Sequence, residues 1–314
     1  MKVVYMGTPD FAVLPLRELV NAGYEVTGVV TQPDKPKGRG KALMPTPVKE
    51  EALKYGLSVY QPDKVKDPAF FEVLKGLEPD IIVVAAFGQI IPKTILDLPE
   101  FGCINIHASL LPKYRGAAPI QQAVIDGEKE SGVTIMKMSI GLDTGDMISK
   151  VVIPLAKDET GGSLFDKLAQ AGAKLLIDTL PDIFAGTAVY EKQPEESPTP
   201  YASMITKQMG LMDFSRKAEE LERLVRGLSP WPSAYTFLKG KNLKVWNCEV
   251  GEPVSGQEPG TVIRSGKDGI CVACCDRELI LKEVQLEGKK RMDADAFLRG
   301  YQMEDGTRLE SHRP

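Results

Sequence analysis

His107 and Asn105 are the residues whose types and spacing first suggest chemistry. The sequence has two histidines, and His107 is the one that follows an apolar run in the middle of the chain. Asn105 stands two positions earlier, so on a β-strand both side chains point to the same face. Asparagine can donate two N–H hydrogen bonds, and histidine can donate or accept them near neutral pH. The pair could stabilise an oxyanion and move a proton, or it could form a hydrogen-bonded cluster within a core.

Asp143 is a candidate partner for this pair. It lies downstream in the segment Gly141-Leu-Asp143-Thr-Gly-Asp146, whose glycines and aspartates also suit an ordinary turn. If the turn brings the carboxylate beside the imidazole, Asp143 can orient the ring for proton transfer. An Asn–His–Asp set without a catalytic serine or cysteine suits acyl transfer to a nucleophile that the substrate brings, with no covalent enzyme intermediate.

Two other motifs argue against common alternatives. The segment Met6–Phe11 has a single glycine where a dinucleotide fingerprint needs three, and Pro9 lacks an N–H for a phosphate, so a dehydrogenase is not favoured. Cys271 and Cys274 have the spacing of a zinc motif, but zinc needs further ligands. The five cysteines are therefore expected to be free thiols, mostly packed in buried strands, and no metal is predicted.

The elements that position these residues follow an alternating pattern. Short β-rich runs alternate with helical stretches up to about residue 190, and several of the runs are apolar throughout, as in parallel strands covered on both faces. This pattern predicts an α/β fold, a Rossmann-like, doubly wound and mostly parallel sheet, with ligands bound at the carboxyl ends of its strands. His107 ends one such strand. The expected strands are Lys2–Met6, Glu25–Thr31, Asp80–Ala85, Cys103–Ile106 and Val133–Met138, and a long helix is expected over Ser163–Phe184.

The character of the sequence changes after a proline-rich segment, Gln193–Pro200, which suits an extended linker. Short strands separated by turn residues then predict a small antiparallel barrel, OB-like in type. We therefore expect a catalytic domain over residues 1–189, a linker over 190–207 and a C-terminal barrel domain over 208–314.

Composition sets the class of protein. The chain of 314 residues has a net charge of −4, so any contact with a polyanion must come from a local basic patch. The cations Lys35, Lys37, Arg39 and Lys41 form such a patch in a loop that follows a strand, although a solvated surface loop would look the same. No apolar run is long enough for a membrane helix, and the N-terminus does not read as a signal peptide. We expect a cytoplasmic protein without a membrane partner. We also expect a monomer, because the sequence has no long apolar heptad pattern that would require a second chain.

Two long segments carry a family resemblance. "NIHASLLPKYRGAAPIQ" followed by "GVTIMKMSIGLDTGDMI" resembles the folate-dependent formyltransferase family. "MGTPDFAV", "TQPDKPKGRGKALMPTPVK", "AAFGQIIP" and "SPWPSAYTFLKGKNLKVWN" resemble its branch that acts on methionyl-tRNA, and together these motifs touch most of the chain. The resemblance implies a Rossmann-like domain, a linker and an OB-like barrel, with 10-formyltetrahydrofolate as the formyl donor and no metal.

The resemblance also implies roles for individual residues. The catalytic asparagine, histidine and aspartate of the family fall on Asn105, His107 and Asp143. The folate-contacting segment falls on Ser109, Leu110, Leu111 and Pro112. The acceptor would be the α-amino group of methionyl-initiator tRNA, whose acceptor stem the basic loop would enter, with Arg39 as its main contact. Apart from the resemblance, we expect cations of the barrel to follow backbone phosphates, although surface lysines on a barrel are usually solvated charges only: Lys239, Lys241, Lys244, Lys289, Lys290 and Arg291.

Several other activities fit the same catalytic set. A formyltransferase could act on an amino sugar nucleotide or on glycinamide ribonucleotide, and water could replace the amine in a formyl-folate hydrolase. A non-catalytic RNA-binding protein on the same fold is a further alternative. The basic loop and the C-terminal barrel favour the tRNA substrate over the small acceptors, and the intact Asn105, His107 and Asp143 favour an enzyme.

Overall fold

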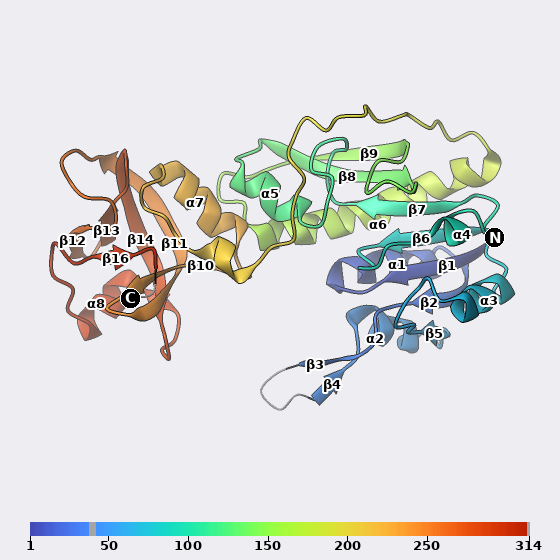
Figure 1. Cartoon of the computed structure of the whole chain (residues 1–314), viewed down its shortest axis with the longest axis horizontal. Helices are drawn as coiled ribbons and strands as arrows, with labels where there is room; N and C mark the ends of the chain where they lie inside the picture. Colours follow the sequence, from blue (N-terminus) through green and yellow to red (C-terminus); the bar gives the residue numbers. More distant parts are fainter. Residues whose placement is uncertain (38–41, 313–314) are drawn as a thin grey trace. The chain divides into compact units, whose positions relative to one another are not determined.

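The computed structural model describes residues 1–37 and 42–312, which form two compact units (Figure 1). The first unit contains Met1–Pro119, Glu130–Pro154 and Phe165–Ala202. The second contains Ile120–Lys129, Leu155–Leu164 and Ser203–Pro314. Two short segments that precede the C-terminal part of the chain, residues 120–129 and 155–164, therefore belong to the second unit.

The first unit is built on a seven-stranded sheet with the order β5-β2-β1-β6-β7-β8-β9. Neighbouring strands from β5 to β7 are parallel, as expected for a Rossmann-like sheet. β8 runs antiparallel to β7, which corrects the expectation that its apolar run marks another parallel strand, and β9, which was not predicted, is antiparallel to β8. The strands are β1 Lys2–Gly7, β2 Glu25–Val30, β5 Val59–Tyr60, β6 Ile81–Ala85, β7 Cys103–His107, β8 Glu130–Lys137 and β9 Met147–Pro154.

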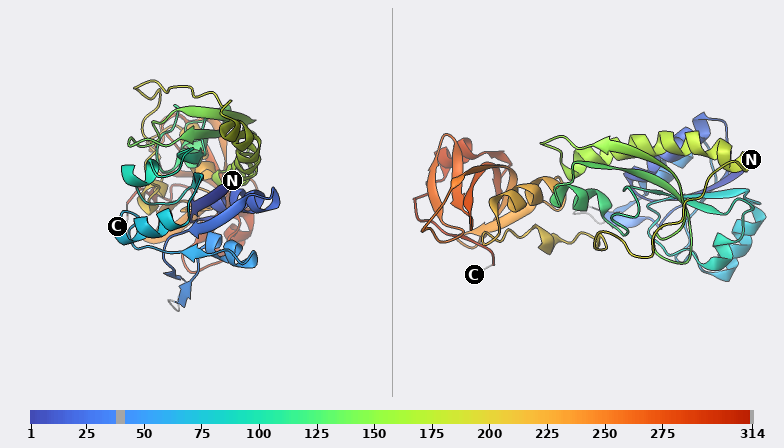
Figure 2. Two further views of the ribbon diagram at one scale, coloured as in Figure 1. Left: turned by 90° about the vertical axis from the view of Figure 1, so that its right-hand side faces the viewer. Right: turned by 90° about the horizontal axis from the view of Figure 1, so that it is seen from above.

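Helices cover both faces of this sheet, as the two views in Figure 2 show. The even-numbered residues of β1, Val4 and Met6, pack in one cluster with Phe70 of α3 and Ile95 of α4. On the opposite face, Gly172 of α6 packs against Ile106 and Val133, so that the helix crosses close to β7 and β8. The helices of this unit are α1 Val13–Asn21, preceded by the 3-10 turn η1 Asp10–Ala12, then α2 Pro47–Lys54, α3 Pro68–Gly76, α4 Lys93–Leu96 and most of α6 Gly161–Ala185.

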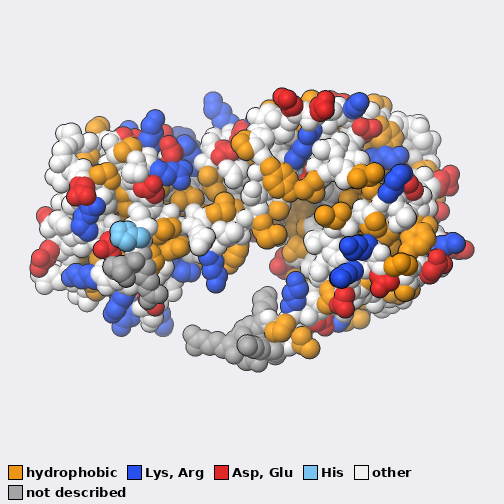
Figure 3. Space-filling view, in the orientation of Figure 1, with side chains coloured by type: hydrophobic (Ala, Val, Ile, Leu, Met, Phe, Trp, Pro, Cys, Tyr) orange, Lys and Arg blue, Asp and Glu red, His pale blue; other side chains and the backbone are white. Residues whose placement is uncertain are grey.

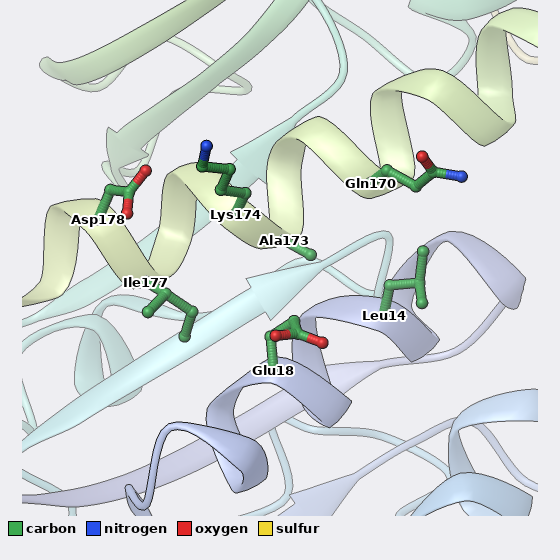
Figure 4. Close-up of a pocket in the computed structure, with 7 residues that line it drawn as sticks. All are labelled: Leu14, Glu18, Gln170, Ala173, Lys174, Ile177 and Asp178. Carbon is green, nitrogen blue, oxygen red and sulfur yellow. The ribbon is translucent and has the colours of Figure 1, made fainter.

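Local sequence signals set where several helices begin. Thr46 caps α2 by accepting a hydrogen bond from the Lys49 N–H, and Asp67 caps α3 by accepting one from Ala69. Pro47 and Pro68 occupy the first helical positions, where the missing N–H costs nothing. α1 and α6 lie side by side, and the shallow groove between them is shown in Figure 4, lined by Leu14, Glu18, Gln170, Ala173, Lys174, Ile177 and Asp178.

The carboxyl ends of the parallel strands meet at one edge of the sheet. Gly7 ends β1 opposite Ala85 of β6, and a Cβ at Gly7 would lie 2.6 Å from the Cβ of Ala12. The glycine is therefore needed for the close turn into the first helix. Thr8 then donates to the carbonyl of Phe87 at 2.9 Å and joins the loops after β1 and β6. His107 ends β7 at the same edge.

The second unit contains the predicted small antiparallel barrel. Its strands follow the path β12-β13-β14-β11-β10-β16, and backbone hydrogen bonds between residues 260–262 and 306–309 link the two ends of that path. Most of α5 also belongs to this unit. The elements are α5 Pro119–Ile125, η2 Lys207–Gly210, α7 Ala218–Gly227, β10 Ala234–Leu238, β11 Lys241–Pro253, β12 Val262–Gly266, β13 Gly269–Ala273, β14 Arg277–Leu286, β15 Met292–Asp293, α8 Ala294–Gly300 and β16 Leu309–Glu310.

The basic segment before α2 is partly a hairpin. β3 Lys35–Lys37 pairs antiparallel with β4 Ala42–Met44, where an irregular loop was expected. On the face drawn in Figure 3, acidic and basic side chains are interspersed over each unit, in keeping with the small net charge. Within the described residues, no helix is both long enough and apolar enough to cross a membrane.

Candidate active site

β7 carries the central pair of the site. Asn105 and His107 lie on the same face of this strand, which has β6 on one side and β8 on the other (Figure 1). Asn105 pairs with Val84 of β6, whose side chain packs toward α3 and α4, so the pair faces away from α6. The His107 residue is only 5% exposed, and Asn105 is half-buried. The strand thus delivers a buried imidazole and an accessible amide to the carboxyl edge of the sheet.

Both ring nitrogens of His107 face acceptors. Nε2 lies 3.0 Å from the carbonyl oxygen of Tyr114, and because a carbonyl can only accept, Nε2 carries the proton. Nδ1 lies 3.8 Å from Oδ1 of Asp143, which is within ion-pair distance but too long for a direct hydrogen bond. The backbone contact fixes the ring, and a doubly protonated ring would pair with the carboxylate by charge.

Asp143 is held in an uncommon backbone conformation. Its φ is +53°, in the left-handed region that residues other than glycine seldom adopt. Its Oδ2 accepts a hydrogen bond of 2.9 Å from the N–H of Gly116, which leaves Oδ1 toward the imidazole. The tight path of this turn also depends on Gly145, where a Cβ would lie 1.7 Å from the carbonyl oxygen of Lys137. The turn is therefore specified both by its own sequence and by the loop that follows β7.

The side chain of Asn105 is available to a ligand. Among the described residues it has no hydrogen-bond partner, although it is half-buried next to His107. A half-buried amide without a protein partner suits a group that donates to a bound molecule. The structure therefore brings together all three residues of the predicted Asn–His–Asp set.

The segment Ser109–Pro112 forms the first part of the loop after β7. The Ser109 hydroxyl is buried and donates to the carbonyl of Lys113 at 2.6 Å. Leu111 is buried against Met136 and Met147 of the neighbouring strands. Leu110 and Pro112 are half-buried. Ser109 and Leu111 thus support the loop from within.

Thr134 of β8 holds this loop in place, and no sequence pattern indicates this role. Its buried hydroxyl donates to the Ser109 carbonyl at 2.7 Å and accepts from the Leu111 N–H at 3.1 Å. Thr134 pairs with His107 across the sheet, so the loop is fixed beside the imidazole. Tyr114 and Gly116 were also missed, because each contacts the site through a backbone atom. Only the antiparallel register, which the sequence did not predict, could have indicated Thr134.

Tyr201 belongs to the last residues of the first unit and lies near the site. Its ring lies against Gly116, and half of its surface is exposed. Burial, followed by the nearby charge of Asp143, raises the pKa of the Tyr201 phenol. A tyrosine phenol can donate a hydrogen bond, so Tyr201 is a polar group at the edge of the site.

The basic residues predicted to contact tRNA are only partly described. Lys35 is exposed on β3, and the backbone of Lys37 belongs to the same strand. Arg39 and Lys41 lie outside the described residues. On the barrel, Lys239, Lys241, Lys289 and Lys290 are exposed.

Two further barrel cations lie against an aromatic ring. The Arg291 guanidinium is 4.6 Å from the ring centre of Trp246 and also pairs with the Glu283 carboxylate. The Lys244 ammonium is 5.5 Å from the same ring. The charge of Arg291 is thus partly engaged within the barrel.

The described residues offer no group of three or more His, Cys, Asp or Glu side chains that could hold a metal ion. All five cysteines are free, and Cys275 is the exposed one. Burial raises the pKa of the Cys103 thiol to about 12 and that of Cys274 to about 12. These two thiols are therefore poor nucleophiles at neutral pH.

Comparison with known families covers both units. The sequence model of the family described as "Formyl transferase" matches residues 1–180. The model described as "Formyl transferase, C-terminal domain" matches residues 204–302. The two matches together extend over most of the chain and reach both the sheet that carries Asn105 and the barrel.

Individual proteins agree with the family models. The chain is 55% identical over 98% of its length to a protein of Agathobacter rectalis named methionyl-tRNA formyltransferase, of which it covers 99%. It is 52% identical over 97% of its length to a protein of the same name from Bacillus subtilis, of which it covers 96%. Among solved structures, an N-formyltransferase from Helicobacter canadensis in complex with folinic acid and dTDP-3-aminofucose has a TM-score of 0.65 at 18% identity, with 90% of this chain and 98% of that chain covered. At that identity the last comparison shows the fold alone.

Proposed function

The chain belongs to the formyl transferase family, and from this membership we propose that it transfers the formyl group of 10-formyltetrahydrofolate to the α-amino group of methionyl-initiator tRNA. The product is N-formylmethionyl-tRNA, the initiator of translation. The observation that carries this function is identity above 50%, over nearly the whole chain and both units, to proteins named methionyl-tRNA formyltransferase. Sugar formyltransferases share the fold only at much lower identity.

Asn105 is proposed to stabilise the negative charge that develops on the formyl oxygen. 10-Formyltetrahydrofolate supplies the formyl carbon that the α-amine of the methionyl group attacks. The Asn105 amide, which has no partner in the part of the chain that the structure describes, can donate to the oxygen of that carbon. An oxyanion donor held in place before the reaction is a large source of rate enhancement. His107, when protonated, adds a positive charge beside it.

Asp143 and His107 are proposed to manage protons. The 3.8 Å separation of Nδ1 and Oδ1 leaves the two groups coupled by charge, and one water molecule could bridge them. Asp143 keeps the imidazole oriented and helps to take the proton that the attacking amine loses. The bond between the formyl carbon and the folate nitrogen then breaks, this nitrogen receives a proton, and tetrahydrofolate leaves.

The loop after β7 is proposed to form one wall of the folate site. Ser109 and Leu111 hold the loop in shape through their buried contacts. Leu110 and Pro112 are the half-buried members of the segment. We assign the direct folate contact to this segment as a whole, in line with the family resemblance of its sequence.

The tRNA is proposed to be held by two groups of cations. Lys35, Lys37, Arg39 and Lys41 would contact the acceptor stem, with Arg39 as the main contact because a guanidinium pairs with phosphate or stacks on a base. The exposed lysines of the barrel would follow backbone phosphates. As further parts of the proposal, the enzyme acts as a monomer in the cytoplasm, where aminoacyl-tRNA is found.

A competition between acceptors tests this function. The purified full chain receives 10-formyltetrahydrofolate labelled in the formyl group, together with methionyl-initiator tRNA, a dTDP-amino sugar, glycinamide ribonucleotide or no acceptor. We expect rapid formylation of the tRNA alone. Faster formylation of either small acceptor, or release of formate at the same rate without an acceptor, would overturn the proposal.

A further inference from the structure

We propose that Gln193 and Arg115 are positioning residues that hold Asp143 against His107. The inference rests on the proposed formyl transfer and adds to it two side chains from distant parts of the sequence. Both are almost completely buried, Gln193 at 5% and Arg115 at 8% exposure. Neither lies within the Asn–His–Asp set itself.

Gln193 holds the turn that carries Asp143. Its Nε2 donates to the carbonyl oxygen of Asp143 at 2.9 Å and to that of Gly145 at 2.7 Å. Both N–H bonds of one amide are therefore used on one turn. Because Asp143 has a positive φ, the turn needs such contacts to keep its conformation.

Arg115 fixes the orientation of the Gln193 amide. Its Nε donates to Oε1 of Gln193 at 3.1 Å, so the amide cannot flip without breaking this bond. The other two guanidinium nitrogens donate to the carbonyls of Glu195 at 3.0 Å and Pro194 at 2.7 Å. Among the described residues, the buried guanidinium has no carboxylate partner and bonds only to neutral oxygens. A buried cation bonded in this way suits a fixed scaffold.

The backbone on either side of Arg115 completes the arrangement. The carbonyl of Tyr114 accepts from His107, and the N–H of Gly116 donates to Asp143. Three consecutive residues therefore reach the imidazole, the Gln193 amide and the carboxylate. A shift of Arg115 would move all three contacts together.

The segment after Gln193 is tied to the same loop. Ser197 donates to the Pro112 carbonyl at 2.9 Å, and the Ala202 N–H donates to the Arg115 carbonyl at 2.9 Å. The segment expected to be a linker thus runs along the site as a strap, defined here as residues 193–202. Gln193 is the point where the strap contacts the Asp143 turn.

Gln193→Glu tests the contact of residue 193 with the Asp143 turn separately from its contact with Arg115. The carboxylate keeps an acceptor for Arg115 and gains an opposite charge, but it cannot donate to the carbonyls of Asp143 and Gly145. We expect kcat for formylation of methionyl-tRNA to fall by roughly 10- to 100-fold, since small misplacement of a catalytic group has effects of this size. KM for both substrates should stay within about threefold, because Gln193 is almost completely buried and its amide N–H groups are used on protein carbonyls.

An NMR signature distinguishes this effect from a structural one. In a His312→Gln background, His107 is the sole histidine, so its ring signals can be assigned directly. Gln193→Glu should move these signals in the same direction as Asp143→Asn does. Glu196→Gln is the matched control, because it exchanges the same two residue types at an exposed strap position whose side chain has no hydrogen bond or ion pair among the described residues, and it should leave both kcat and the ring signals close to those of the parent.

The outcomes are decisive in each case. A folded Gln193→Glu enzyme with kcat within about threefold of wild type, or with unchanged His107 signals, overturns the proposal. If this variant does not fold, Arg115→Lys, which keeps the charge but loses the planar fork, must lower kcat with the same signature. A wild-type chain that does not formylate methionyl-tRNA would instead defeat the proposed function, whereas the response of the His107 signals to Gln193→Glu would still test the positioning role.

Discussion

His107 lies between two acceptors, the carbonyl of Tyr114 and the carboxylate of Asp143. Such a ring can donate from both nitrogens when it is protonated, and in the proposed mechanism it then places positive charge next to the reacting carbon. Asn105, whose amide has no hydrogen-bond partner among the described residues, is the neutral donor proposed on the same strand. Division of work between a charged and a neutral donor suits a reaction whose oxyanion is short-lived.

Asn105→Ala should separate catalysis from folding. We expect the single-turnover rate at saturating substrates to fall by about 100- to 1,000-fold, the usual effect of losing one oxyanion donor. The midpoint of thermal unfolding should change little, since the side chain makes no hydrogen bond within the described residues. Asn105→Asp, which keeps the shape but replaces the donor by an acceptor, should be at least as slow. Turnover close to wild type in Asn105→Ala would remove this residue from the mechanism.

Some residues of the candidate site can be predicted from the sequence, and others cannot. Asn105, His107 and Asp143 could be predicted because their types, spacing and motif suggest chemistry before any fold is known. Gln193 and Arg115 could not, because each is an ordinary polar residue whose role depends on burial and on a contact between distant segments. Backbone contributions, such as the N–H of Gly116, leave no trace in residue type.

At the level of elements, the parallel part of the sheet was predictable and its antiparallel edge was not. An apolar run such as that of β8 does not indicate whether the strand is parallel or antiparallel to its neighbour. A strand buried on both faces shows no alternation of apolar and polar residues from which this could be inferred. β9 alternates in exposure, and its one charged residue, Lys150, interrupts its apolar pattern. The direction of β8 matters, because it places Thr134 beside His107.

The contact between α1 and α2 gives a test by pH. Glu51 of α2 is buried and accepts from Arg17 of α1 at 2.6 Å and from Lys54 at 2.7 Å. The hydrogen bond from Arg17, with a smaller one from Lys54, lowers the pKa of the Glu51 carboxyl below its ordinary value of 4.5. Its stabilising effect is therefore complete above the pKa of the unfolded chain and is lost as the pH falls through the lower, folded-state pKa.

Glu51→Gln should accordingly lower the free energy of unfolding at pH 7. Hydrogen bonds to charged groups are typically worth about 1.5–3 kcal/mol, and we expect a loss on this scale in urea unfolding. The difference from wild type should shrink as the pH falls below 4.5, the ordinary pKa of the glutamate carboxyl. Glu78→Gln, which removes an exposed ion pair with Lys2, should have a much smaller effect at either pH. A Glu51→Gln deficit that is constant with pH would contradict the assignment.

At the level of the whole molecule, charge must be local to hold a polyanion. The net charge of −4 gives no general attraction for tRNA, so affinity has to come from clusters such as the exposed lysines of the barrel. Within each unit the fold brings residues together from separate parts of the sequence. The association of residues 120–129 and 155–164 with the second unit was not predictable from a linear domain boundary.

If the barrel lysines contact phosphates of the tRNA, they should contribute to the salt dependence of tRNA binding. Each lost phosphate contact lowers the slope of log K against log salt by about 0.9, so Lys289→Ala with Lys290→Ala should reduce it by somewhat under two. A filter-binding titration of methionyl-tRNA at several salt concentrations measures this slope. The control pair Lys64→Ala and Lys66→Ala removes two exposed lysines of the first unit and should leave it unchanged. An unaltered slope in the Lys289 and Lys290 variant would exclude these residues as phosphate contacts.

Arg39 tests the other group of cations. Arg39→Ala should raise KM for methionyl-tRNA or lower kcat with it, while the affinity for 5-formyltetrahydrofolate, measured by fluorescence, stays the same. The reason is that the residue is assigned to the nucleic acid and not to the folate. Equal losses of tRNA use and folate affinity would show that the basic segment acts on the site as a whole.

The proposed reaction is direct transfer of the formyl group between two substrates in the site around Asn105, His107 and Asp143. A rapid-quench experiment with the full chain and donor labelled in the formyl group, with and without methionyl-initiator tRNA, tests it most directly. We predict that the label moves only when the tRNA is present, appears on the α-amino nitrogen of methionine, and is never bound covalently to the protein. Label retained on the denatured protein, or released as formate equally fast without tRNA, would contradict the account.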